Sequence, residues 1–246
     1  MKLNINSHDI PFGTDILSIT VPPALRQRHQ TGLHYVDGVM GGRGFTPSTV
    51  TIFTGEPGAG KTTMALSLCN GLTGQGHIAV FNTAEESLHQ ISLTTERLGL
   101  KHGFLTGNTD CLDDLIEGLR GIQSANPKKQ LFFIVDSLQC MHYMHPKFGR
   151  YHSATGALEM ITNFCKETNA IAIIINQVNK SGKMAGSNKL KHMVDCHLHL
   201  SIEQRDPDLL GCRVLTAEKN RFGGCGHLVF LDMAEEGFKL VGTFKK

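Results

Sequence analysis

From about residue 49 onward, short β-rich apolar runs alternate with longer stretches of helical period along this 246-residue chain. This alternation is typical of a parallel sheet wrapped by helices. The runs LFFIV and AIAIII contain no polar alternation, which predicts central strands buried on both faces. The predicted strands are 49–54, 77–82, 131–135 and 170–176. The helices predicted between them are 61–74, 86–99, 109–125 and 153–168.

The pattern changes near both ends of the chain. After about residue 195, three closely spaced strand-like runs, DCHLHLS, CRVLTAE and HLVFLDM, are joined by turn-rich segments. They predict antiparallel strands that extend the same sheet through hairpins. Residues 1–30 are rich in proline and lack a clear period, which predicts an arm or docking segment. We therefore expect that segment to be followed by one α/β domain over residues 31–246, with a mostly parallel central sheet flanked by helices.

Composition narrows the class of protein without selecting a partner. Hydrophobic residues make up 40% of the chain and charged residues 19%, an ordinary globular balance that argues against global disorder. The formal net charge is +2, so any surface that binds nucleic acid must be a local basic patch. No apolar run is as long as a membrane span, and the first residues lack a signal-peptide core. We expect a cytoplasmic protein.

Cysteines and histidines do not predict a metal site. The seven cysteines include no C-x-x-C pair, which is typical of reduced thiols. His197 and His199 would share one face of a strand, but no third ligand lies near them in the sequence. We interpret both histidines as structural.

The clearest chemical motif follows the first predicted strand. Residues 55–62, GEPGAGKT, match G-x-x-x-x-G-K-[ST] between a strand and a helix. Backbone N–H groups in such a loop, together with the helix N-terminus, bind phosphate oxygens. Lys61 would reach the β- and γ-phosphates of ATP, and the Thr62 hydroxyl would bind Mg²⁺. The residues predicted to bind the nucleotide are Gly55, Glu56, Pro57, Gly58, Ala59, Gly60, Lys61, Thr62 and Thr63.

Acidic residues at the ends of two other strands complete the predicted site. Asp136 ends the apolar run LFFIV, where a P-loop enzyme needs a carboxylate for its hydrated magnesium ion. Glu85 and Glu86 follow the strand 77–82, and either could be the general base that activates water. Alternatively, both could cap the next helix, because carboxylates are favourable near a helix N-terminus. The sequence favours catalysis at one of them, with Glu85 ahead of Glu86.

The fourth predicted strand ends at the same edge of the sheet. Gln177 follows its apolar run and could contact the γ-phosphate, reporting its loss to the segment beyond. That segment, residues 178–187, is small and polar and carries Lys180 and Lys183. These features indicate a candidate contact for a phosphodiester backbone. A solvated surface loop explains the same composition equally well.

Together these elements resemble the RecA-like ATPases, and most specifically the bacterial RadA/Sms branch, over residues 31–238. The pieces that carry the resemblance are TGLHYVDGVMGG, GEPGAGKTT, AEESLHQISLTTERLGL, VDSLQ, AGSNKLKHMVD and EKNRFG. The five residues KNRFG look like the RadA signature. RadA proteins also carry a four-cysteine zinc module and a Lon-like domain, so we expect a bare motor core here. Gln177 departs from the branch, which usually has histidine at that position.

The resemblance implies a homo-oligomeric ring, a hexamer, with each ATP at a subunit boundary. Lys61 and the residues for magnesium and water would act within one subunit. Lys219 and Arg221 would reach across the boundary as cationic fingers against the γ-phosphate of the neighbour's ATP.

The resemblance also implies that residues 178–187 and 138–153 face a central channel and bind single-stranded DNA. The second segment combines Lys147 and Arg150 with aromatic side chains, a mixture that single strands favour. Packing of a long loop against its own subunit would explain the same aromatics.

Three functions follow from this reading. The leading one is a DNA-dependent ATPase that translocates on single-stranded DNA to unwind or branch-migrate recombination intermediates. A replicative-helicase-like or strand-exchange ATPase is the second, and a slow ATP-switched assembly module is the third. The ATPase rate with and without single-stranded DNA separates the motors from the switch.

Overall fold

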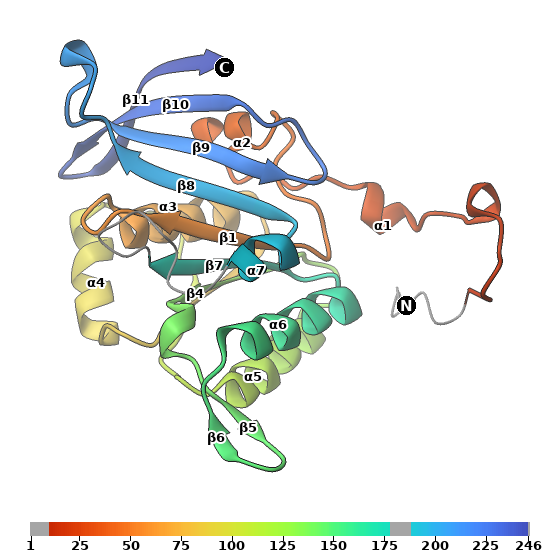
Figure 1. Cartoon of the computed structure of the whole chain (residues 1–246). Coiled ribbons are helices and arrows are strands. Elements are labelled where there is room, and N and C mark those ends of the chain that lie inside the picture. The colour runs from red at the N-terminus through yellow and green to blue at the C-terminus, as the bar shows by residue number, and fades with distance from the viewer. Residues whose placement is uncertain (1–9, 178–187, 246) are drawn as a thin grey trace.

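A mixed sheet runs through the structure in the strand order β11-β10-β9-β8-β1-β7-β4-β2-β3 (Figure 1). The computed structural model describes residues 10–177 and 188–245. The parallel strands are β1 (Val50–Gly55), β2 (Ile78–Thr83), β3 (Leu105–Gly107), β4 (Leu131–Asp136), β7 (Ile171–Gln177) and β8 (Cys196–Ile202). The antiparallel strands are β9 (Arg213–Asn220), β10 (His227–Ala234) and β11 (Gly237–Lys245).

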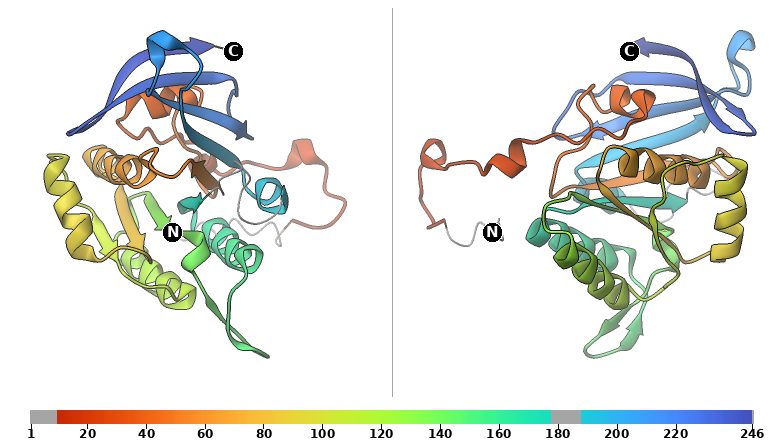
Figure 2. Two further views of the ribbon diagram at one scale, coloured as in Figure 1. Left: turned by 60° about the vertical axis from the view of Figure 1, so that its left-hand side comes forward. Right: turned by 180° about the vertical axis from the view of Figure 1, so that it is seen from behind.

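Helices cover both faces of this sheet (Figures 1 and 2). One face packs against α2 (His34–Val39), α3 (Lys61–Gly74) and α4 (Leu88–Arg97). The other face packs against α5 (Leu112–Ala125), α6 (Ala154–Thr168) and α7 (Asn188–Met193). The remaining short elements are α1 (Pro23–Arg26), the 3₁₀ turns η2 (Ile16–Ser18), η3 (Leu138–Cys140) and η4 (Pro207–Leu209), and the hairpin β5 (Tyr143–His145) and β6 (Gly149–Tyr151).

The central strands are apolar without alternation because both of their faces are buried. Every residue of β1, β2 and β4 is buried, as is every residue of β7 before Gln177. Successive residues of β4 enter opposite cores: Phe132 packs in the core on the α3 side, whereas Phe133 packs in the core on the α5 and α6 side. Two cores therefore fix the position of the strand ends that carry polar residues.

The predicted strands and helices are confirmed, with shifts at their ends. α4 begins at Leu88, not at residue 86, because Ser87 and Gln90 form a reciprocal capping box. α5 begins at Leu112, not at residue 109. The Asn82 side chain holds the backbone N–H and carbonyl of Thr109, at 3.2 and 2.9 Å, in a non-helical loop. The three C-terminal runs form β8, β9 and β10 as expected.

The segment before residue 29 leaves the body of the protein as an arm (Figures 1 and 2). Phe12, Ile16 and Leu17 on this arm are exposed large hydrophobic residues. The chain joins the body where His29 forms an isolated bridge with Phe45. A docking role for the arm stays a prediction. Within residues 10–177 and 188–245, no helix is long and apolar enough to cross a membrane.

Candidate active site

The phosphate-binding motif forms the turn between β1 and α3. Gly60 caps α3 with φ of +102°, a left-handed conformation that favours glycine. Phe238 and Met233 occupy the space next to Gly60, where a side chain would collide with them. The Lys61 ammonium bends back over the loop and donates to the carbonyl oxygens of Gly55 and Glu56, each at 3.0 Å. The cation expected to reach phosphate is thus held at the loop itself.

Thr62 and Asp136 meet at the end of β4. The Thr62 hydroxyl donates to Asp136 Oδ2 at 2.8 Å, and Asp136 is 8% exposed. Burial raises the pKa of Asp136 to about 6; the hydrogen bond from Thr62 opposes this shift, and the nearby Glu85 and Glu86 add to it. A hydroxyl and a carboxylate this close supply the oxygen ligands that Mg²⁺ prefers. The two residues therefore fit the predicted magnesium ion.

Glu85 is held by side chains from two neighbouring strand ends. The Gln177 amide nitrogen, at the end of β7, lies 3.2 and 3.1 Å from the two carboxylate oxygens of Glu85. The Ser137 hydroxyl, directly after β4, also donates to Glu85. Neither Glu85 nor Glu86 lies in the first turn of α4, which Ser87 caps. The alternative interpretation, in which both glutamates cap this helix, is wrong.

These residues line one pocket of about 380 Å³ at the carboxyl edge of the parallel strands. Burial lowers the pKa of Lys61 in this pocket, and the carboxylates of Asp136 and Glu85 oppose that shift. Glu86 does not line the pocket. The lining residues are Pro57, Gly58, Gly60, Lys61, Thr62, Thr63, Glu85, Asp136, Gln177 and Met233.

Two contributors to this site were missed by sequence reasoning. Ser137 directly follows Asp136, so the dipeptide itself could have drawn attention to its hydroxyl. Met233 enters the pocket from β10, on the far side of β8 and β9 from the phosphate loop. No local pattern in the sequence indicates that position.

Lys219 and Arg221 lie outside this pocket. β9 runs antiparallel to β8, and Lys219 pairs with His197, whereas Gly55 pairs with Leu200 farther along β8. The two cations consequently lie toward the opposite end of the sheet from their own phosphate loop. Lys219 does not line the pocket and neither does Arg221.

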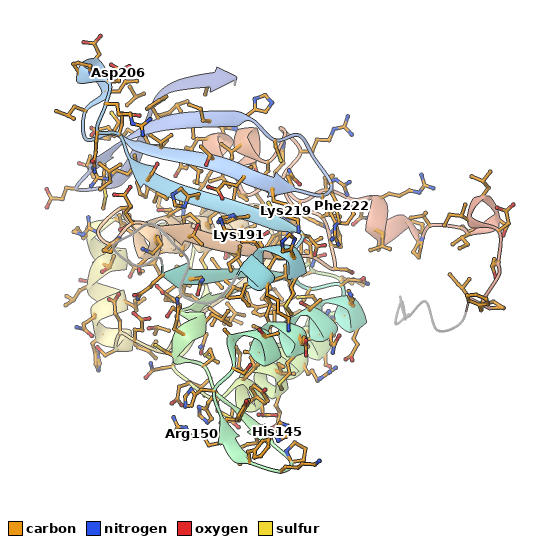
Figure 3. The ribbon with its side chains drawn as sticks, viewed as in Figure 1. His145, Arg150, Lys191, Asp206, Lys219 and Phe222 are labelled. Atoms are coloured by element: carbon orange, nitrogen blue, oxygen red, sulfur yellow. The ribbon has the colours of Figure 1, made fainter. Side chains whose placement is uncertain are left out.

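Both cations instead bind the segment around the end of α7. The Lys219 ammonium donates to the carbonyl oxygens of Lys191, His192 and Val194, at 3.0, 3.3 and 2.6 Å. Figure 3 labels Lys191 and Lys219, which lie together where α7 crosses the sheet. Arg221 forms an ion pair with Asp195 at 2.9 Å. These contacts close the C-terminal end of the helix, where cations are favourable.

The residues predicted to bind DNA are only partly described. Lys180 and Lys183 lie outside the described residues. Lys147 is exposed in the β5–β6 hairpin, which projects from the body (Figures 1 and 3). Arg150, in the same hairpin, forms an ion pair with Asp110 at 2.6 Å.

The aromatic side chains of the hairpin stack on one another. Phe148 stacks on His145 and on Tyr151, with ring centroids 4.7 and 5.7 Å apart. Phe148 is nevertheless 67% exposed. Packing against the subunit therefore does not account for the whole ring, and one of its faces or edges stays open to a ligand.

His197 and His199 do not lie in a metal cluster. Both rings hydrogen-bond to the hydroxyl of Thr54, at 2.7 and 2.8 Å. Among residues 10–177 and 188–245, no group of three or more histidine, cysteine, aspartate or glutamate side chains could hold a metal ion.

Known proteins similar to this chain are ATPases and DNA repair proteins. The family described as "ATPase: KaiC" matches residues 29–108. DNA repair protein RadA of Haemophilus influenzae is 32% identical over 216 residues, which cover 87% of this chain and 45% of the relative. DNA repair protein RadA of Escherichia coli is 32% identical over 220 residues, which cover 88% and 45%. The chain thus spans about half the length of the curated relatives it matches.

Two solved structures show the same fold. The ATPase domain of a helicase superposes with a TM-score of 0.72 at 13% identity, covering 85% of this chain and 90% of that one. A KaiC-like protein of Pyrococcus horikoshii OT3 superposes with a TM-score of 0.68 at 17% identity, covering 88% and 99%. The α/β RecA-like fold expected from the sequence is confirmed. The chain is a KaiC-like RecA-fold ATPase domain, related at about 30% identity to part of the DNA repair proteins named RadA.

Proposed function

We propose that this chain is an ATP-hydrolysing motor of the RadA type, which binds single-stranded DNA and drives translocation, branch migration or unwinding in recombination and repair. The observation that carries the proposal is the convergence of Lys61, Asp136, Glu85 and Gln177 in one pocket beside the phosphate loop. RadA relatives over 87% of the chain support the link to DNA repair.

Each residue of the pocket has a role in hydrolysis. Backbone N–H groups of residues 55–62 bind the phosphates of ATP, and Lys61 exchanges its two carbonyl contacts for phosphate oxygens. Thr62 and Asp136 hold Mg²⁺, which would neutralise charge on the phosphates when bound. Glu85 accepts a proton from the attacking water.

Gln177 and Ser137 orient the base. Both donate to the Glu85 carboxylate, which fixes its position beside the phosphate loop. Loss of the γ-phosphate would free Gln177, which leads directly into residues 178–187. The segment that carries Lys180 and Lys183 would then respond to the state of the nucleotide.

Lys219 and Arg221 complete the site of a neighbouring subunit in a hexameric ring. Their distance from their own phosphate loop supports this assignment, because neither lines the pocket that its own subunit forms. Cations that approach the γ-phosphate from across a boundary stabilise the charge of the transition state.

Single-stranded DNA would bind in the channel of such a ring. Lys180, Lys183, Lys147 and Arg150 supply phosphate contacts, and the exposed ring of Phe148 supplies a surface on which a base can stack. Arg150 would first have to leave its ion pair with Asp110.

The test is the steady-state ATPase rate with and without single-stranded DNA. The proposal expects strong stimulation by DNA, and no turnover with or without DNA in Lys61→Ala. The match to the KaiC family favours one other function, a slow ATP-switched assembly module. Slow turnover that ignores DNA would support that module and refute the motor.

A further inference from the structure

A row of polar side chains crosses the sheet on the face that α7 covers. The Thr54 hydroxyl lies 2.7 Å from Nε2 of His197 and 2.8 Å from Nδ1 of His199. Nδ1 of His197 lies 2.9 Å from the Glu218 carboxylate, which also pairs with Lys191 of α7 at 3.3 Å. Hydrogen bonds and one ion pair thus connect β1, β8, β9 and α7.

Stability alone does not explain this row. Thr54 is 1% exposed and His197 is 2% exposed, in a sheet whose central positions are mostly apolar. Well-packed apolar residues of similar volume are often at least as stable as buried polar or ionic contacts. Beside Thr54 on β7, Asn176 is fully buried, and neither atom of its amide has a hydrogen-bond partner in the described part of the chain.

The hydrogen bonds of the row depend on one another. An ionised Glu218 only accepts, so Nδ1 of His197 donates to it. A neutral His197 ring then accepts from the Thr54 hydroxyl through Nε2, and the Thr54 oxygen accepts from Nδ1 of His199. A displacement of Thr54 therefore disturbs the bond that reaches Glu218.

Each end of the row adjoins a residue of the ATPase site. Thr54 directly precedes Gly55, whose carbonyl oxygen accepts from Lys61. Glu218 directly precedes Lys219, which closes the end of α7. When Lys61 turns toward a nucleotide, the end of β1 loses two contacts that now hold the loop closed.

We propose that His197 and Glu218 are positioning residues that link the nucleotide state of a subunit to the placement of Lys219 and Arg221. The proposal rests on the shared-site function above. A bound nucleotide moves the end of β1, the row transmits that movement to Glu218, and the contacts of Lys219 and Arg221 with α7 loosen. A subunit then offers its cations to its neighbour only after it has bound ATP itself.

Backbone hydrogen exchange tests this link without hydrolysis or DNA. Adding a non-hydrolysable ATP analogue to the wild-type protein should speed exchange in residues 188–195 and 218–222 by about tenfold. In His197→Gln and in Glu218→Gln the analogue should still bind, with affinity within about twofold of wild type, and the change in exchange should vanish. Glu218→Gln alters a partly exposed side chain, so it keeps the test valid if His197→Gln does not fold.

A matched control is Glu167→Gln, which breaks the exposed Arg120–Glu167 ion pair at 2.7 Å on the same face of the sheet. This variant should respond to the analogue as wild type does. In steady-state assays Glu218→Gln should also lose cooperativity for ATP, with a Hill coefficient near 1, whereas the control should keep it.

The link is refuted if the analogue binds wild type without changing exchange in residues 188–195, or if Glu218→Gln responds as wild type does. These results are independent of the motor function. A wild-type protein with no ATPase activity would refute the motor, yet the response to the analogue could still be measured.

Discussion

At the scale of single residues, the site assigns different work to two adjacent glutamates. Glu85 lines the pocket and is held by Gln177 and Ser137, whereas Glu86 does not line it. Glu85→Gln should keep ATP binding and lower the hydrolysis rate by about 10²- to 10⁴-fold, because the amide keeps the shape of the base without its proton affinity. Steady-state turnover and binding of an ATP analogue measure the two effects.

Glu86→Gln is the matched control and should turn over ATP near the wild-type rate. The reverse result, with Glu86→Gln inactive and Glu85→Gln active, would move the base by one residue.

Glu218 gives the protein a defined response to acid. Its hydrogen bond to His197 holds the pKa of Glu218 at about 2, and burial only partly opposes this. A depressed carboxyl pKa stabilises the folded state above the unfolded pKa, and this stability is lost as pH falls toward the folded pKa. Its loss should occur between about pH 4.5 and 2.

Glu218→Gln should therefore be less stable than wild type at pH 7 by about 1 kcal/mol, a figure reduced for the partial exposure of the side chain. Unfolding in denaturant at pH 7 and at successively lower pH measures the difference. The gap between the two proteins should narrow below pH 4.5; a constant gap would mean that the carboxylate charge is not what stabilises the fold.

Most residues of the pocket were predictable because they follow a common rule. The phosphate loop, Asp136 and Gln177 each end a parallel strand, and the carboxyl ends of parallel strands meet at one edge. Apolar runs that stop at a polar residue mark those ends in the sequence. Met233 breaks the rule, since it arrives on an antiparallel strand whose place depends on the order of β8, β9 and β10.

At the scale of elements, the strength of the local pattern decided what could be predicted. The long buried strands and the helices of 10 to 15 residues were found, with end shifts caused by Ser87 and Asn82. β3 and the β5–β6 hairpin were not, since each of these strands has three residues and a pattern that short has no readable period. β11, at the sheet edge, was missed because its polarity is mixed and its glycines interrupt it.

The β5–β6 hairpin carries two cations that should not behave alike toward DNA. Lys147 is exposed, whereas Arg150 is already paired with Asp110. If Lys147 contacts phosphate, Lys147→Ala should reduce the slope of log affinity against log salt by roughly 0.7 on single strands.

Arg150→Ala should reduce the same slope by less, because part of its charge is neutralised by Asp110. Equal changes in both variants would show that the ion pair opens fully on DNA. No change for Lys147→Ala would place the hairpin outside the DNA path.

At the scale of the whole molecule, the shared site predicts complementation between two inactive proteins. Arg221→Ala alone should lower kcat by about 10³-fold or more while it still binds nucleotide. Lys61→Ala alone should be inactive because its own loop cannot hold the phosphates. Rings that mix the two contain boundaries where an intact Lys61 faces an intact Arg221, so partial ATPase activity should return.

The control for this mixture is a labelled subunit that reports exchange between rings. Recovery should follow the extent of exchange. Full exchange without any recovery would refute the shared site and leave Lys219 and Arg221 with only their contacts to α7.

The place of Lys219 and Arg221 also has a consequence for how much ATP the protein consumes. A lone chain has one half of the chemistry at each end of its sheet and holds the cationic half against its own α7. On the shared-site proposal, specific activity must then fall on dilution, in step with dissociation of the ring. Newly made or dispersed chains would spend no ATP, and consumption would begin only where enough copies have gathered to close a circle.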